Sequence, residues 1–399
     1  MRLHPETFAL TILLAAMTML SSLANDMYIP SLPDIATRLV ATPAQVQLTL
    51  SAYLLGFAVG QIFYGPISDK TGRKPVIFAG FVLFVGATLV CAAAPSIAVL
   101  VAARFVQALG AAGPIILARA VVRDLYEGPR ATRELSTMAA MMGIGPVLAP
   151  VLGSVLQVAF GWRSSFIGTG ALGLVIGGAA VVLLPETLKK AHAGPLSFGS
   201  VFASFGIVWR NSAFRAYAAL LAAAYAGVFS FVSASSFVLQ DVYGLSPLAF
   251  GGAFMVAAAA MIVGSRLAGR FAAKPDRTIL WAAILMAAGG LTQALALFVL
   301  PSSATALVAT ETLYMLGLGM AFPTLLGAAV MPFPERAGAA ASLSGVIQMA
   351  AACVVGTIVG AAIGTSAWPL VGATLFCGCL SLLLALATRG IRTRAGVTP

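Results

Sequence analysis

Charged residues are scarce in this sequence of 399 residues. Asp, Glu, Lys and Arg together make up 9% of the chain, whereas hydrophobic residues make up 60%. A soluble domain carries about 25% charged residues, so this chain lacks the charge needed to cover a surface that faces water. The composition therefore excludes a soluble globular enzyme and indicates a protein whose solvent is lipid.

Cysteine and histidine are also rare, with four and two residues. The cysteines lie in apolar runs without His or acidic neighbours at metal-ligand spacing, so neither a disulfide scaffold nor a metal site is predicted. The two histidines, His4 and His192, lie at the terminus and in the middle loop. Because the chain also lacks a nucleotide-binding loop, we expect no catalytic residue, no enzyme activity and no cofactor.

Long hydrophobic runs follow one another along the whole chain. A helix needs about 20 apolar residues to cross a hydrocarbon core of ~30 Å, and β-barrel strands would alternate polar with apolar residues, which these runs do not. The sequence therefore predicts an all-α membrane protein with twelve transmembrane helices. The predicted spans are 7–29, 46–67, 76–94, 97–118, 135–160, 165–184, 214–238, 249–267, 278–300, 304–329, 338–363 and 367–388.

The positive charges predict the orientation of the chain. Of the 23 Lys and Arg residues, only Arg38 and Arg163 fall in loops after odd-numbered spans, and Arg104 lies inside a span. The others lie in loops after even-numbered spans or at the termini, and Lys and Arg in short loops stay on the cytoplasmic side. Both termini are therefore expected in the cytoplasm, and the net charge of +11 reflects topology, not a nucleic-acid partner.

The longest segment between spans divides the twelve predicted helices into six and six. We predict an N-terminal bundle over 1–185, a cytoplasmic linker over 186–213 and a C-terminal bundle over 214–399. Two six-helix halves with a site between them near mid-depth are a common transporter plan. The sequence thus favours two pseudo-symmetric bundles in one transporter.

Three charged residues fall well inside predicted spans, away from the span ends: Asp26, Arg104 and Glu311. Such residues normally face the protein interior and often mark an ion or substrate path. Arg104 lies roughly 14 Å along its helix from Pro95, and Glu311 roughly 15 Å from Pro301, at ~1.5 Å per residue. If Arg104 neutralises one acid, burial disfavours the charged form of the other. We therefore predict proton coupling by these three residues, without assigning which acid is paired.

Two alternatives remain open for these residues. Asp26 could be an interfacial residue that caps the next turn, because Pro30 follows closely. Arg104 could hold a helix contact through Gln107, one turn away. Aromatic and Met residues on spanning helices can likewise face lipid or a neighbouring helix. With that alternative in view, we predict that a substrate cavity is lined by Tyr53, Gln107, Phe231, Tyr314 and Met315.

Several motifs together resemble the major facilitator superfamily, and within it the twelve-helix drug:proton antiporters of the bicyclomycin and chloramphenicol resistance type. Three of them resemble motifs of the superfamily or its proton-coupled and antiport members: GPISDKTGRK at 65–74, RFVQALGAAG at 104–113 and GPVLAPVLGS at 145–154. Four others match the subgroup: NDMYIPSLPDIA at 25–36, VRDLY at 122–126, AGVFSFVSASSFV at 226–238 and RAGAAASLSG at 336–345.

The resemblance implies alternation between inward-open and outward-open states around a cavity lined by helices one, four, seven and ten. Asp26 and Arg104 match family positions implicated in proton coupling, whereas Glu311 matches no shared motif. The implied protein is a monomer in the bacterial inner membrane. Its partners are protons, the lipid bilayer and a small drug-like molecule, and a proton gradient supplies its energy.

Residues for gating are also implied by the motifs. Asp69 can pair with Arg73 or Arg123 and latch the cytoplasmic side, although these charges could also be solvated topology determinants. In the fifth helix, Pro146 and Pro150 each remove a backbone hydrogen bond, which suits a bending element or a static kink. The full predicted gating set is Gly65, Asp69, Gly72, Arg73, Arg123, Gly145, Pro146, Pro150 and Gly153.

The first hypothesis is therefore export of a moderately hydrophobic, uncharged or cationic small molecule, driven by inward proton flow. A metabolite exporter or a proton-coupled importer would use the same scaffold, because a fold does not fix the cargo. A channel or membrane sensor belongs to another class. Against a channel stands the lack of a repeated charged pore lining in the sequence.

Overall fold

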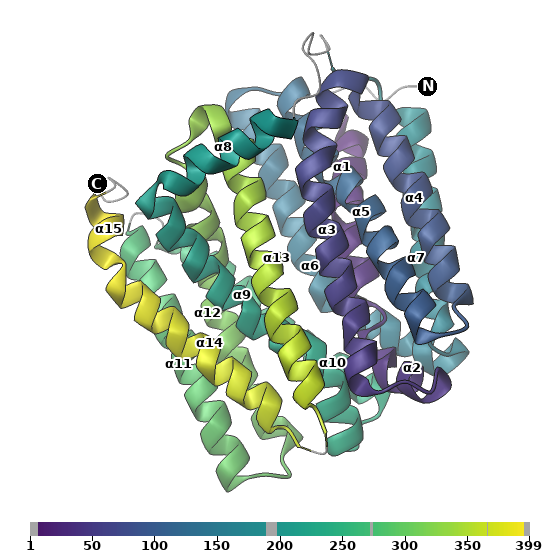
Figure 1. Ribbon diagram of the computed structural model, residues 1–399, viewed down its shortest axis with the longest axis vertical. Helices are drawn as coiled ribbons and strands as arrows, with labels where there is room; N and C mark the ends of the chain where they lie inside the picture. Colours follow the sequence, from purple (N-terminus) through teal and green to yellow (C-terminus); the bar gives the residue numbers. More distant parts are fainter. Residues whose placement is uncertain (1–6, 189–197, 272–273, 365, 395–399) are drawn as a thin grey trace. The chain divides into compact units, whose positions relative to one another are not determined.

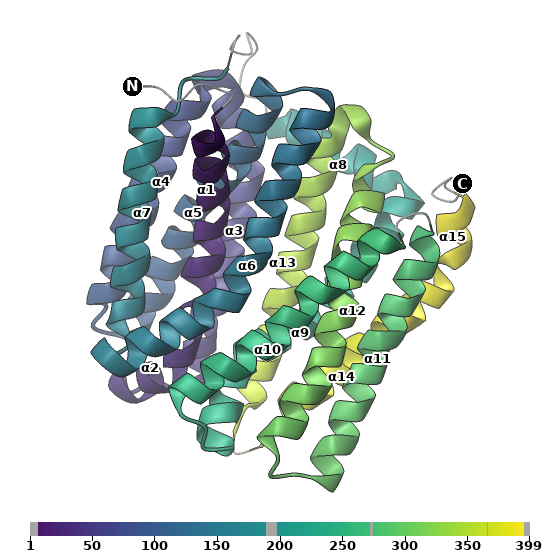
Figure 2. The same ribbon diagram turned by 180° about the vertical axis from the view of Figure 1, so that it is seen from behind.

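The chain is described by a computed structural model that covers residues 7–188, 198–271, 274–364 and 366–394. Within these residues, twelve helical segments are long and apolar enough to cross a membrane. Figures 1 and 2 show them as packed helices, seen from opposite sides. The prediction of an all-α membrane protein with twelve spans is confirmed.

The helices belong to two compact units. Unit 1 comprises Met1–Ala41 with Leu48–Phe198, and unit 2 comprises Thr42–Gln47 with Gly199–Pro399. The limits predicted for the two bundles and the linker stay a prediction.

Unit 1 is built around α1, which packs against α5, α6 and α7, while α4 packs against α5 and α7. Figure 2 shows α1 in dark purple beside α6. The elements of this half are α1 (Phe8–Asp26), η1 (Ile29–Ser31), α2 (Leu32–Arg38), α3 (Pro43–Thr71), α4 (Arg73–Ala93), α5 (Ile97–Leu125), α6 (Gly128–Phe160) and α7 (Arg163–Leu183).

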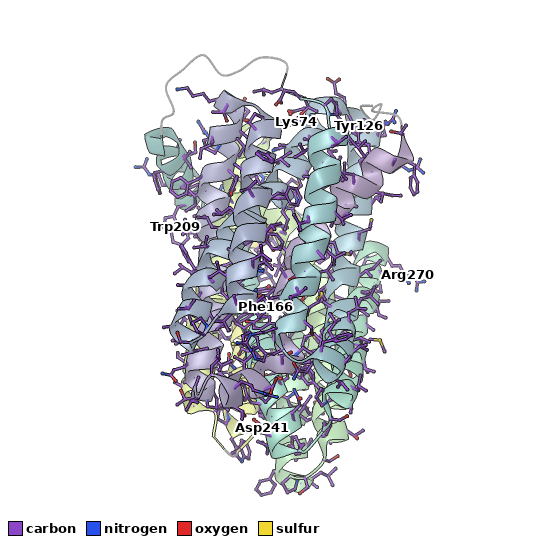
Figure 3. All side chains as sticks on the ribbon, turned by 90° about the vertical axis from the view of Figure 1, so that its right-hand side faces the viewer. Lys74, Tyr126, Phe166, Trp209, Asp241 and Arg270 are labelled. Carbon is purple, nitrogen blue, oxygen red and sulfur yellow. The ribbon has the colours of Figure 1, made fainter. Side chains whose placement is uncertain are left out.

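Unit 2 has α12 and α9 at its centre, because both contact several other helices of the unit. Its elements are α8 (Phe198–Arg210), α9 (Ser212–Phe237), η2 (Val238–Val242), α10 (Pro247–Arg270), α11 (Pro275–Val299), α12 (Ala304–Val330), η3 (Pro334–Arg336), α13 (Ala337–Ala362), α14 (Trp368–Ala387) and α15 (Arg389–Arg394). The short helix α8 presents an exposed Trp209, labelled in Figure 3.

Side-chain caps explain several helix starts. Ser96 Oγ accepts the Val99 N–H at the start of α5, and Ser303 Oγ accepts the Ala306 N–H at the start of α12. Asn211 Oδ1 accepts the Phe214 N–H at the start of α9. Each side chain satisfies one of the backbone donors that a helix leaves unpaired in its first turn.

The helices differ from the predicted spans mainly at their ends. The fifth spanning helix, α6, starts at Gly128 and has 33 residues, although its apolar run begins later. Helical hydrogen bonds form as readily in the polar turns outside the hydrocarbon as inside it, so hydropathy underestimates helix length. The first helix is shorter than predicted: α1 ends at Asp26, and the chain goes on through η1 into the short helix α2. Pro30 and Pro33, which cannot donate a backbone hydrogen bond, follow this end.

An ion pair ties the end of unit 2 to its third spanning helix. Arg392 on α15 is 2% exposed, and its Nη2 lies 2.7 Å from Asp276 Oδ1 at the start of α11. Arg392 Nη2 also donates to the Ala385 carbonyl at 2.9 Å. Arg392 thus holds α15 against the start of α11.

Candidate functional site

The predicted proton-coupling residues of unit 1 meet where α1 ends. The last carbonyls of a helix have no partner within the helix. Here the Ala24 carbonyl accepts a hydrogen bond of 2.9 Å from Arg104 Nη1 on α5. Arg104 therefore binds the negative end of the α1 dipole, where a positive charge is favoured.

Arg104 is fully buried, with 0% of its surface exposed. Its guanidinium carbon lies 4.3 Å from the ring centroid of Tyr28 and 4.2 Å from that of Tyr53. Phe166, labelled in Figure 3, lies at 5.8 Å. Cation–π contacts of this kind can be worth about 2 kcal/mol or more when the cation is desolvated. Aromatic rings and backbone dipoles therefore stabilise the charge of Arg104, which forms no ion pair within the described residues.

Polar side chains fix the groups around Arg104. Gln107 Oε1 accepts from Arg104 Nη1 at 2.6 Å, and Gln107 Nε2 donates to Thr88 Oγ1 on α4 at 2.8 Å. The Tyr53 hydroxyl lies 2.9 Å from Ser21 Oγ on α1. Two donors of Arg104, Nε and Nη2, are buried without a hydrogen-bond partner. The guanidinium thus keeps spare donors beside the end of α1.

Asp26 is the last residue of α1 and is 7% exposed. Its Oδ1 accepts a hydrogen bond of 2.8 Å from the side chain of the adjacent Asn25. Among the described residues no cation forms an ion pair with Asp26. The contact between Arg104 and Gln107, which the sequence left open as an alternative, is present, and it occurs without pairing Arg104 to the carboxylate.

The predicted gating glycines of α6 pack against α1. A Cβ on Gly153 would overlap the Met27 carbonyl oxygen and lie 2.6 Å from the Met27 carbonyl carbon. A Cβ on Gly145 would meet the Ser22 Cβ at 3.0 Å. These glycines let α6 approach the helix that carries Asp26. Pro146 and Pro150 both lie inside α6, and a gating role for all four residues stays a prediction.

A charged cluster at one end of unit 1 contains the predicted latch. Arg73 Nη1 lies 2.5 Å from Asp69 Oδ1, and Arg73 Nε lies 2.9 Å from Asp124 Oδ2 on α5. Of the two partners predicted for Asp69, the structure shows Arg73, and Arg123 is exposed. Figure 3 shows Lys74, the neighbour of Arg73, at the same end of unit 1 as Tyr126. Asp124, which joins α5 to this cluster, was not among the predicted residues.

Glu186 completes this cluster at the N-terminus of α4. Glu186 Oε1 accepts the Arg73 N–H at 2.9 Å, and Oε2 accepts the Lys74 N–H at 3.0 Å. Gly72, the N-cap residue, has no side chain to do this and has φ +99. A Cβ on Gly72 would also meet Glu186 Oε2 at 2.7 Å, so glycine is required there for two reasons. Gly65 has no atom within 4 Å of such a Cβ.

Glu186 lies beyond the end of α7, outside the membrane-spanning segments. Partial burial by itself would raise the pKa of its carboxyl. Backbone N–H groups of Leu188, Arg73, Lys74 and Thr187 outweigh this effect, and the pKa lies below the ordinary value of 4.5. The carboxyl is therefore ionised at neutral pH, as a cap at the positive end of a helix should be.

Unit 2 holds the remaining predicted residues. Glu311 on α12 is 0% exposed, and its Oε2 accepts a hydrogen bond of 2.9 Å from Gln293 Nε2 on α11. The Tyr314 hydroxyl donates to the Ala224 carbonyl on α9 at 3.1 Å. Phe231 is buried against Phe254, with ring centroids 5.5 Å apart. Met315 is buried as well.

The structure thus gathers Asp26, Arg104, Gln107 and Tyr53 around the end of α1. The predicted residues of unit 2 lie in its core, and their role in a substrate cavity stays a prediction. Sequence reasoning missed Tyr28, Gln293 and Glu186. Gln293 could have been noticed as a polar residue inside a predicted span. Glu186 could not, because nothing in the sequence links it to the start of α4, which it caps.

The sequence is similar to known membrane transporters. Residues 14–357 match the model of the family described as Major Facilitator Superfamily. The chain is 30% identical over 407 residues to a bicyclomycin resistance protein homolog of Haemophilus influenzae, covering 99% of this chain and 100% of the relative. It is 32% identical over 341 residues to multidrug resistance protein D of Escherichia coli, covering 85% of each.

A solved structure supports the fold. The crystal structure of a bacterial homolog to the human lysosomal transporter Spinster, in an inward-facing and occupied conformation, superposes with a TM-score of 0.70. It covers 100% of this chain and 98% of that chain at 16% identity. Because the family model spans most of the sequence and the spans and fold agree with it, this chain belongs to the Major Facilitator Superfamily.

Proposed function

We propose that this protein exports small, drug-like molecules across the bacterial inner membrane in exchange for protons. Its similarity to a bicyclomycin resistance protein homolog over 99% of the chain supports export of such compounds. The single observation that carries proton coupling is the burial of Asp26 and Glu311 inside spanning helices without an ion-pair partner among the described residues. A buried carboxyl that is unpaired is far less costly when it is protonated.

In this proposal Asp26 takes up and releases a proton beside Arg104. When Asp26 is protonated, Arg104 is held by the Ala24 carbonyl, Gln107 and the two tyrosine rings, as described above. When Asp26 loses its proton, the new carboxylate attracts the spare Nε and Nη2 donors of Arg104. The two protonation states therefore favour different contacts between α1 and α5, which can couple proton flow to a conformational change.

The remaining parts of the proposal concern the setting of the transporter. We infer a small-molecule cargo that is moderately hydrophobic and uncharged or cationic, no enzymatic step and no cofactor, with the proton gradient as energy source. Both termini lie in the cytoplasm and the protein acts as a monomer. A reporter fused after residue 399 should be active only if it is a cytoplasmic one, and activity of an external reporter there would reverse the orientation.

The test is export itself. Expression in a drug-sensitive bacterium should lower accumulation of at least one compound of a panel, and an uncoupler should abolish the effect. Asp26→Asn and Glu311→Gln remove one titratable group each with little change in shape, so each should lose pH-gradient-driven transport at equal expression. Thr312→Ser, beside Glu311 and half-buried, keeps the hydroxyl; it is the matched control and should transport normally. Full transport by both acid variants would refute the assignment of the proton sites.

A further inference from the structure

The core of unit 2 contains a carboxyl and an amide that face each other. Glu311 on α12 and Gln293 on α11 are both 0% exposed, and α11 packs along α12. Gln293 Nε2 donates to Glu311 Oε2 at 2.9 Å. This bond uses one oxygen of the carboxyl and the nitrogen of the amide, so one oxygen of each group is left.

Both remaining oxygens are buried without a hydrogen-bond partner: Glu311 Oε1 and Gln293 Oε1. An unsatisfied buried acceptor is unfavourable, because it has lost its hydrogen bonds to water without gaining others. If Glu311 is ionised, the two atoms are both acceptors and cannot satisfy each other. A proton on Glu311 Oε1 changes this, because the resulting O–H can donate to Gln293 Oε1. The acid and the amide then form a cyclic pair with two hydrogen bonds that satisfies both groups.

Among the described residues of unit 2, no cation forms an ion pair with Glu311 that could replace this proton. The charged residues on the helices that pack against α11 and α12 within unit 2 lie in end turns. They are Arg215 on α9, Arg266 and Arg270 on α10, Asp276 and Arg277 on α11, and Arg389, Arg392 and Arg394 on the short helix α15, where Arg389 and Arg392 pair with Asp276. Gln293 is roughly 24 Å along α11 from Arg277, at ~1.5 Å per residue. At that distance an ion pair with Glu311 is excluded.

The other titratable groups near Glu311 are uncharged donors. The Tyr314 hydroxyl already donates to the Ala224 carbonyl at 3.1 Å. The Cys377 thiol on α14 is buried beside Gly227 and Tyr314. Gln293 is thus the polar side chain bonded to the carboxyl, and a proton is the species that completes their pairing.

We propose that Glu311 and Gln293 form a proton-binding site inside unit 2, in which the proton on Glu311 Oε1 is bonded to Gln293 Oε1. Gln293 is the positioning residue of this site. Release of the proton to water leaves a carboxylate and two facing acceptor oxygens, so deprotonation weakens the contact between α11 and α12. This site deepens the proposed function. Its role in transport rests on that function, whereas the pairing of Glu311 with Gln293 does not.

Infrared difference spectroscopy on the purified full chain tests the pair without a substrate. At near-neutral pH the wild type should show the C=O stretch of a protonated carboxyl that disappears in Glu311→Gln. In Gln293→Leu the band should persist at higher wavenumber, because the carboxyl loses its hydrogen-bond partner. Asp26→Asn is the control for the other buried acid and should leave the Glu311 band unchanged. Absence of the band in the wild type, or an unshifted band in Gln293→Leu, would overturn the proposal.

A swapped pair keeps the test decisive if Gln293→Leu does not fold. The double variant Glu311→Gln with Gln293→Glu restores an acid and an amide on the same two helices, so the band should return near its wild-type position. Failure of the swap to restore it, in a protein that unfolds at the wild-type temperature, also counts against the site. If the band is found but Glu311→Gln transports normally, the proton site stands and its part in the proposed function fails.

Discussion

The close contact of α6 with α1 gives the sharpest prediction. A methyl group on Gly153 would lie 2.6 Å from the Met27 carbonyl carbon and 3.0 Å from its Cα. Carbon atoms pack at about 3.5–4.0 Å, so Gly153→Ala must separate the two helices by roughly 1 Å. The obstacle is backbone, which cannot rotate away. Overpacking of this kind costs about 1–3 kcal/mol and occasionally more, and we expect the upper end here.

Two other glycines of α6 provide a graded comparison. Gly145→Ala meets a side-chain carbon at 3.0 Å, whereas Gly143→Ala meets no atom within 4 Å. Alanine is better than glycine in a helix by about 0.5–1 kcal/mol. The expected order of thermal stability is therefore Gly143→Ala at or above the wild type, Gly145→Ala close to it and Gly153→Ala clearly lowest.

Thermal unfolding of the purified protein in detergent measures this order, and transport assays measure its consequence for function. Because Met27 follows Asp26 directly, displacing it should move the carboxyl relative to Arg104, so Gly153→Ala should also reduce proton-driven export. If Gly153→Ala were as stable as Gly143→Ala and equally active, the inferred close contact with α1 would be refuted.

Three further predictions concern charged side chains. Glu186→Gln should lower the free energy of unfolding at neutral pH by about 1 kcal/mol or less, because the carboxyl is exposed and only its cap is lost. Folding depresses the pKa of this carboxyl, so its stabilising effect is lost as it becomes protonated. The difference from wild type in unfolding experiments should therefore vanish as the pH falls below 4.5. Arg104→Lys keeps the charge but loses the planar fork, so proton-driven export should fall at least tenfold, and wild-type rates would contradict the described role of the guanidinium. Arg392→Met removes the buried partner of Asp276 and leaves only the exposed Arg389, whose Nε lies 3.3 Å from Asp276 Oδ2. The cost in thermal unfolding should therefore stay below that of an uncompensated buried charge, about 3–5 kcal/mol, and exceed that of the control. The control is Arg38→Met. Arg38 pairs with Asp34, but its side chain is 70% exposed, so this substitution should cost less than about 1 kcal/mol.

Much of the fold could be predicted from the sequence because lipid imposes one-dimensional constraints. Apolar runs of sufficient length must form helices. A charge inside such a run is costly and therefore conspicuous, and this cost identified Asp26, Arg104 and Glu311. The partners of these charges could not be predicted in the same way. Tyr28 contacts Arg104 only because α1 ends and the chain turns there, and Gln293 reaches Glu311 through the packing of two helices. Neither contact follows from spacing along the chain.

The cap of α4 has a consequence for how the protein is made. The carboxylate that accepts the Arg73 N–H belongs to Glu186, 113 residues later in the chain. Helix α4 therefore leaves the ribosome long before its cap has been translated, and domains generally fold as units during synthesis, N-terminal first. The N-terminus of α4, the third span, can therefore form its hydrogen bonds to Glu186 only after α7, the sixth span, and the residues that follow it have been made.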